Sequence, residues 1–77
     1  MSNNAAQPGD RVVWCLRRRT ADVRCVLYGR LPVEVLIFHD REVVVTEIFQ
    51  EEWMALDWAR AYADRLRAHG WADVGGE

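Results

Sequence analysis

The sequence predicts an α+β fold, a three- or four-stranded antiparallel β-meander followed by one C-terminal α-helix packed on one face of the sheet (β-β-β-β-α). Three observations predict it. Residues 11–49 contain four short runs rich in β-branched and aromatic residues, each ended by turn residues. The connections between the runs are short, which favours antiparallel neighbours over crossovers. Residues 51–71 then carry apolar residues at helical spacing and close on Gly70-Trp71.

The four runs set the predicted strand boundaries at 11–18, 23–28, 33–38 and 42–49. Thr20-Ala21-Asp22 offers a turn after the first strand. The segment 29–32 ends the second strand, because Pro32 has no backbone N–H to give to a central ladder. His39-Asp40-Arg41 is short enough to join the last two strands as a hairpin. The strands are therefore expected to form a meander.

The helix is predicted from Glu51 to Gly70. One apolar stripe, at ~100° per residue, contains Ala55, Ala59, Tyr62 and Leu66. The alanines in this stripe are small, so the helix axis can come close to the sheet. Glu51 in the first turn suits the positive end of the helix dipole. Gly70 can take the left-handed conformation that ends a helix, and Trp71 follows as the apolar residue that folds back onto the helix end.

From about Trp14 to Trp71 the chain resembles a group of small uncharacterised bacterial proteins with a strand-rich front and one C-terminal helix. The resemblance is carried by segment 33–42, Ala55, Ala59, Leu66, Gly70 and Trp71. It implies the fold and transfers no functional site. Arg41 replaces the glycine expected after the turn aspartate, and Tyr62 stands where tryptophan is common. The first departure leaves open a two-residue turn or a longer loop with a bulge.

One domain is expected at 11–71, with flexible tails at 1–10 and 72–77. A net charge of −2 and a pI near 5.6 give no overall attraction to nucleic acid or to an anionic membrane. The first ten residues lack the basic start and apolar core of a signal peptide. No apolar run approaches the ~20 residues of a membrane span. We therefore expect a cytoplasmic protein without a membrane partner.

Cys15 and Cys25 lie five residues either side of Thr20. A first hairpin that turned symmetrically about Thr20 would bring the two thiols together across the ladder, so a bridge is one alternative. Free thiols in a reducing compartment are the expected state. The spacings of the cysteines and of His39 and His69 match no zinc motif, and no metal site is predicted.

No catalytic site is predicted either. The sequence contains no Ser/Cys-His-acid arrangement and no phosphate-binding loop. Glu51 and Glu52 are neighbours on a helix and do not face each other, and Asp40 merely follows His39. An apolar sheet under one helix leaves little room for a cleft. The expectation is a non-enzymatic protein with no cofactor and no inferred small-molecule ligand.

Successive side chains of a strand point to opposite faces of a sheet, so alternation divides each predicted strand into two sets. The residues assigned to the helix side are Cys25, Leu27, Val33, Val35, Ile37, Val44 and Ile48. The residues assigned to the opposite side are Val26, Tyr28, Leu36, Phe38, Val43, Val45 and Phe49, framed by Arg24, Glu34 and Glu47. Neither set is polar, as one would be in a sheet with a solvated face. A single bulge would exchange the two sets of a strand.

An apolar patch of this size exceeds what monomers usually leave exposed, and an apolar centre inside a charged frame is typical of an interface. The leading prediction is a small interaction module that forms a homodimer, or binds another protein, through the face opposite the helix. Two structural alternatives remain: the N-terminal segment with Trp14 folds over that face, or its apolar residues are scattered surface.

The runner-up function is single-stranded nucleic-acid binding. Arg17, Arg18 and Arg19 end the first strand, Arg24 follows on the second, and Trp14 is nearby. Basic and aromatic side chains on strands can hold phosphates and stack on bases. The negative net charge disfavours this reading, and a basic strand end also serves to prevent edge-to-edge pairing of sheets.

Overall fold

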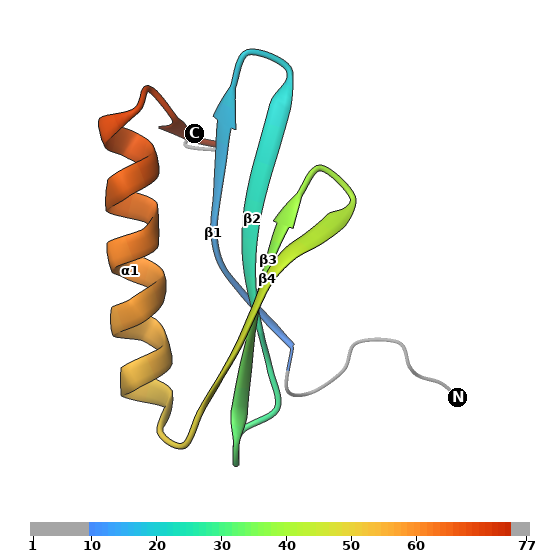
Figure 1. The fold of residues 1–77 in the computed structure, drawn as a ribbon, viewed down its shortest axis with the longest axis vertical. Coiled ribbons are helices and arrows are strands. Elements are labelled where there is room, and N and C mark those ends of the chain that lie inside the picture. The colour runs from blue at the N-terminus through green and yellow to red at the C-terminus, as the bar shows by residue number, and fades with distance from the viewer. Residues whose placement is uncertain (1–9, 75–77) are drawn as a thin grey trace.

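The computed structural model describes residues 10–74, which form a five-stranded antiparallel sheet and one helix (Figure 1). In chain order the elements are β1 (Arg11–Arg18), β2 (Ala21–Tyr28), β3 (Val33–His39), β4 (Glu42–Phe49), α1 (Glu52–Ala68) and β5 (Ala72–Asp73). The strands lie side by side in the order β4-β3-β2-β1-β5. The predicted β-β-β-β-α fold is confirmed, with a fifth strand added after the helix.

The helix α1 connects the two edges of the sheet. It follows β4, lies along one face of the sheet (Figure 1), and is followed by β5 beside β1. In β5, Ala72 pairs with Arg17 and Asp73 pairs with Leu16. The prediction of a flexible tail from residue 72 is corrected, because residues 72–73 form β5 and the N–H of Val74 donates to the carbonyl oxygen of Cys15 at 3.0 Å. The remainder of the predicted C-terminal tail, 75–77, and residues 1–9 of the predicted N-terminal tail lie outside the described residues.

The turn that brings β5 back to the sheet is the predicted Gly-Trp ending. Gly70 has φ 94°, and its N–H donates to the carbonyl oxygen of Arg67 at 3.1 Å. The N–H of Trp71 donates to the carbonyl oxygen of Leu66, also at 3.1 Å. These two bonds form a Schellman motif, which occupies helix carbonyls that would otherwise lack donors. The chain therefore reverses within three residues and returns to β1.

The core lies between the sheet and a stripe of alanines on α1. Ala55, Ala59 and Ala63 are buried, as helical spacing requires of one face. The strand residues that face them are Val23, Cys25, Leu27, Val33, Val35 and Ile37. Because the helix contributes only methyl groups at its closest approach, larger rings fill the space on either side of the stripe. Those rings belong to Trp14, Phe49, Trp58, Tyr62 and Trp71.

Two hairpins join the four long strands. Arg18 pairs with Ala21, so the first turn consists of Arg19 and Thr20 rather than the predicted 20–22. His39 pairs with Glu42, so the second turn consists of Asp40 and Arg41.

Asp40 has φ 59°, whereas Arg41 is not among the residues with positive φ. A turn with positive φ only at its first centre needs no glycine at its second, which explains how Arg41 is accommodated.

The two hairpins are tied together by their aspartates. The backbone N–H of Asp40 donates to the carbonyl oxygen of Asp22 at 2.7 Å. In return, the backbone N–H of Asp22 donates to Oδ1 of Asp40 at 3.1 Å. These bonds join the β3–β4 turn to the start of β2.

Candidate functional site

The sheet face opposite α1 carries a patch of apolar side chains. Residues that pair directly across antiparallel strands share a face, so the register identifies its members. Val26 pairs with Val12 on one side and with Leu36 on the other, and Phe38 pairs with Val43. We define the far-face patch as Val12, Val26, Tyr28, Leu36, Phe38, Val43 and Ile48. Five of the seven residues predicted for this face belong to it: Val26, Tyr28, Leu36, Phe38 and Val43.

The other two predicted residues, Val45 and Phe49, lie on the helix side. Val45 pairs with Ile37, Phe49 pairs with Val33, and both pack against the core. Phe49 also lies 6.0 Å from the ring of Trp58. Glu47, which pairs with Val35, is on the helix side as well and not in the frame of the far face.

The cause of the error is one extra residue in β4. The β3–β4 register shifts between Ile37 and Phe38, so that Val44 is inserted between the partners Val43 and Val45. An unbulged hairpin would have placed Val44 and Ile48 under the helix, as predicted. Both are instead exposed, with exposed fractions of 52% and 60%. The bulge therefore exchanges the two faces of β4 beyond Val44.

The far-face patch has an exposed border and a partly protected centre. The outer residues Val12, Val43 and Ile48 are 64%, 46% and 60% exposed. At the centre, Val26 is only 6% exposed, and Tyr28, Leu36 and Phe38 are half-buried. Trp14, which one alternative placed over this face, lies on the helix side with its ring stacked on Tyr62.

Opposite charges lie at the two ends of the patch. On β2, the guanidinium of Arg24 lies over the ring of Phe38, 4.7 Å from its centroid. On β3, Glu34 pairs with Tyr28 at the other end. Phe38 and Glu34 are four residues apart, which corresponds to ~13 Å along a strand. Arg24 and Glu34 therefore flank the apolar residues without forming an ion pair with each other.

The two cysteines do not face each other. Cys15 pairs with Arg24 on the far face, whereas Cys25 pairs with Trp14 on the helix side. The two-residue turn at Arg19-Thr20, rather than a turn centred on Thr20, sets this register. Both thiols are free, and burial raises the pKa of the Cys25 thiol to about 12. Among residues 10–74, no group of three His, Cys, Asp or Glu side chains is placed to hold a metal ion.

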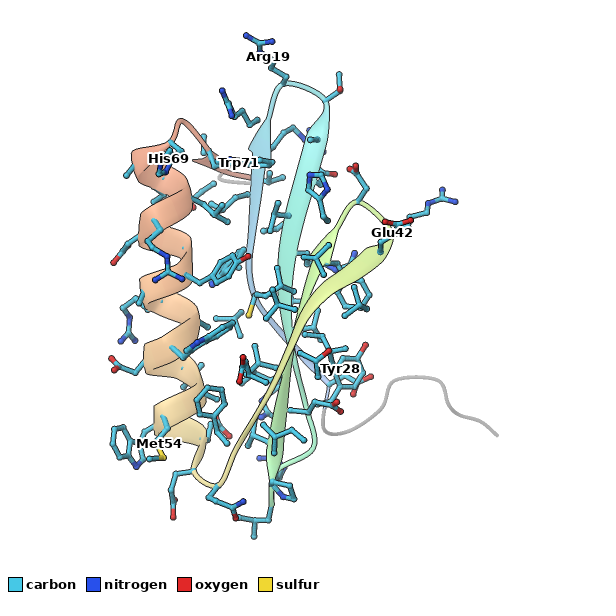
Figure 2. All side chains as sticks on the ribbon, viewed as in Figure 1. Arg19, Tyr28, Glu42, Met54, His69 and Trp71 are labelled. Atoms are coloured by element: carbon cyan, nitrogen blue, oxygen red, sulfur yellow. The ribbon has the colours of Figure 1, made fainter. Side chains whose placement is uncertain are left out.

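The arginines predicted as a nucleic-acid surface are divided between separate regions. Arg17 and Arg24 belong to the far face, where Nε of Arg17 lies 2.7 Å from Oδ1 of Asp22. The hydrogen bond from Arg17 lowers the pKa of the Asp22 carboxyl. Arg18 is on the helix side near Gly70, and Arg19 is at the tip of the first hairpin (Figure 2). The structure thus does not bring the four arginines onto one surface.

The structure also contains a groove that the sequence did not predict. It lies where the β1–β2 hairpin meets the C-terminal end of α1 and consists of two adjoining hollows of about 320 and 470 Å³. Arg18 and Trp71 line both hollows. The expectation of little room for a cleft overlooked this end of the sheet. The sequence feature that could have predicted the groove is Trp71, because an apolar residue after the glycine that ends a helix folds back against that helix.

Comparisons with known proteins found no matching family model, no similar curated protein and no similar solved structure. The resemblance to the small bacterial group stays a prediction. Within the described part of the chain, no helix has the length and apolar character needed to cross a membrane.

Proposed function

We propose that this chain is a small non-enzymatic interaction module that forms a homodimer through the far-face patch. The observation that carries the proposal is the arrangement of this patch: exposed apolar residues lie between a cation at one end and an anion at the other. Apolar residues with a charged rim are typical of protein interfaces. Within residues 10–74, this face also lacks the second layer of secondary structure that normally buries one face of a sheet.

The charges make the patch complementary to a second copy of itself. Consider two sheets face to face, with a two-fold axis between them that runs across the strands over the Val26–Leu36 pair. This axis places the Arg24 end of each patch against the Glu34 end of the other. Two equivalent ion pairs then form, one on each side of the apolar centre. The same patch therefore serves both partners, as a closed two-fold dimer requires.

The size of the face sets the expected strength. Four strands of about eight residues, spaced ~4.8 Å apart, cover roughly 500 Å² before side-chain relief is counted. Standard stable interfaces bury ~800 Å² per partner. The expected dimer is therefore weak, with a Kd in the micromolar range. Val26 contributes little to it, since the monomer already protects this side chain.

Sedimentation equilibrium from low to high micromolar concentration tests the proposal. We expect the average mass to rise from that of one chain towards that of two. Val43→Glu places a carboxylate at an exposed position of the patch and should shift the chain to the monomer. Trp53→Glu is the matched control, because Trp53 is 65% exposed on α1, away from the patch.

A strict monomer at all concentrations would contradict the proposal and make a different protein the candidate occupant of this face. A dimer that Val43→Glu leaves intact would show that the contact lies elsewhere.

A further inference from the structure

The groove between the β1–β2 hairpin and the end of α1 has chemistry that the dimer does not use. Its first hollow is lined by Arg18, Arg19, Thr20, Ala21 and Trp71. Its second hollow is lined by Arg18, Tyr62, Arg65, Leu66, His69 and Trp71. Figure 2 labels Arg19, His69 and Trp71 around this end of the molecule. Among residues 10–74 no acidic side chain lines either hollow, although the chain as a whole has a net charge of −2.

The guanidinium groups of the groove retain unused hydrogen-bonding capacity. Within residues 10–74, no carboxylate lies at ion-pair distance from Arg18, Arg19 or Arg65. Asp64 and Asp73, the acidic residues at this end of α1, are both bound by Arg67, each at 3.0 Å. Guanidinium groups bind phosphate and carboxylate in a bidentate manner. The groove therefore has a local positive charge suited to an anion.

Aromatic rings lie beside these cations. Arg65 lies over the ring of Tyr62, 5.2 Å from its centroid, which holds the guanidinium in place. Trp71 is half-buried, and its ring meets that of His39 at 69° in an edge contact. A half-buried indole between two hollows offers a surface on which a planar ring can stack. An inorganic anion alone would leave this surface unused.

The C-terminal end of α1 does not cancel the positive charge. A helix end carries roughly half a negative charge, whereas the groove has three guanidinium groups. Two of the terminal carbonyl groups already accept hydrogen bonds from the N–H groups of His69, Gly70 and Trp71. Nδ1 of His69 lies 2.8 Å from the carbonyl oxygen of Arg65, a contact in which Nδ1 must donate because the carbonyl can only accept.

We propose that this groove binds a nucleotide unit. Arg18 and Arg65 hold its phosphate, with Arg19 near the opening, and its base stacks on Trp71. Hollows of about 320 and 470 Å³ lie in the range of small-ligand sites and suit one unit rather than a long strand. A free nucleotide and one nucleotide of a single strand share this chemistry. The site is separate from the far-face patch, because Arg18, Tyr62 and Trp71 lie on the helix side.

The test follows the indole N–H signal of Trp71 in ¹⁵N-labelled full-length protein. The probes are purine and pyrimidine nucleoside monophosphates, the matching nucleosides, inorganic phosphate, and short single-stranded oligonucleotides with and without a 5′-phosphate. We expect monophosphates to move the Trp71 signal at low salt and to leave that of Trp53 unchanged. Nucleosides and inorganic phosphate should each bind at least about tenfold more weakly, because each lacks one half of the recognised unit.

Variants assign the response to the groove. Arg18→Gln and Arg65→Gln should each weaken monophosphate binding by about tenfold, the effect of one lost charged hydrogen bond. Arg60→Gln is the control, because Arg60 is an exposed arginine of α1 outside the groove. The remaining signals of each spectrum report whether the variant is folded. Val43→Glu should bind normally, which separates this site from the dimer.

If oligonucleotides bind at least as tightly as monophosphates, whether or not the oligonucleotide carries a 5′-phosphate, the ligand is a nucleotide within a single strand. Binding only of monophosphates and phosphorylated ends would identify a free or terminal nucleotide. The proposal is overturned if no probe moves the Trp71 signal at low salt, if nucleosides or inorganic phosphate bind as tightly as monophosphates, or if both arginine variants bind normally.

Discussion

The indole N–H of Trp14 donates a 2.8 Å hydrogen bond to the backbone carbonyl oxygen of Ala59. This bond joins Trp14, the residue that follows the β1 bulge, to the middle of α1. The Arg19-Thr20 turn pairs Trp14 with Cys25 and so directs the indole towards the helix, whereas the bulge places Val12 on the far face. The bond therefore ties β1 to the helix at Ala59, which is fully buried.

Trp14→Phe should lower the free energy of unfolding by about 1 kcal/mol. Phenylalanine keeps most of the ring but cannot donate to Ala59, and one hydrogen bond contributes about that much. Denaturant unfolding measures the change. Trp53→Phe is the control and should change stability by less than about 0.5 kcal/mol, because the Trp53 ring is exposed. Equal effects of the two variants would show that the Trp14 bond has no stabilising role.

Ala59→Leu should destabilise the fold by about 1–3 kcal/mol, because a larger side chain forces the helix away from the sheet. Ala61→Leu is a matched control on the same helix, because Ala61 is exposed. Alanine and leucine are both strong helix formers, so the exchange itself changes helix propensity little. Thermal or denaturant unfolding of the two variants measures the difference. If Ala59→Leu were as stable as Ala61→Leu, the helix would not be packed as closely as the structure has it.

The two thiols should differ in reactivity. Cys15 is partly exposed, whereas Cys25 is buried beneath α1 with a pKa of about 12. Because the thiolate is the reactive form, a colorimetric disulfide reagent at neutral pH should modify Cys15 first and Cys25 only on unfolding. Mass spectrometry of the partly modified protein locates the label. Rapid modification of Cys25, or a bond between the two cysteines, would contradict the observed strand register.

The raised pKa of Cys25 also predicts a loss of stability at high pH. The ordinary value for the thiol is 9.0, and burial raises it to about 12 in the folded chain. Above pH 9 the unfolded chain releases this proton while the folded chain retains it. The free energy of unfolding therefore falls as the pH rises from 9. The free energy of unfolding of Cys25→Ala should therefore decline less steeply above about pH 9, towards pH 12, than that of the unmodified protein. Parallel declines would mean that Cys25 is not buried.

Much of the fold could be predicted because its signals are local. The alanine stripe at helical spacing and the Gly70-Trp71 ending each depend on residues within a few positions of one another. The face of β4 could not be predicted, since one inserted residue, Val44, reverses the alternation and nothing in its sequence marks the insertion. The groove depends on Arg18 and Trp71, which line the same hollows only because β5 pairs with β1.

The candidate interface was predicted in part for the same reason. Residues of β2 and β3 were assigned to the correct face because these strands pair without a register shift. Val45 and Phe49 were misplaced because they follow the bulge. Alternation along a strand is thus a sound guide between bulges and fails across one.

The most direct test of the proposed dimer is a charge reversal across its two-fold axis, read as the dimer Kd by sedimentation equilibrium. Arg24→Glu or Glu34→Arg alone should raise the Kd by about tenfold. Each single variant turns two equivalent attractive pairs into repulsive ones, and the change in each pair costs up to ~1 kcal/mol. The double variant Arg24→Glu, Glu34→Arg should restore a Kd close to the original. Both residues lie on interior strands, so pairing between β4 edges would not respond to them. Single variants without effect, or a double variant as weak as the worse single one, would contradict association through the far-face patch.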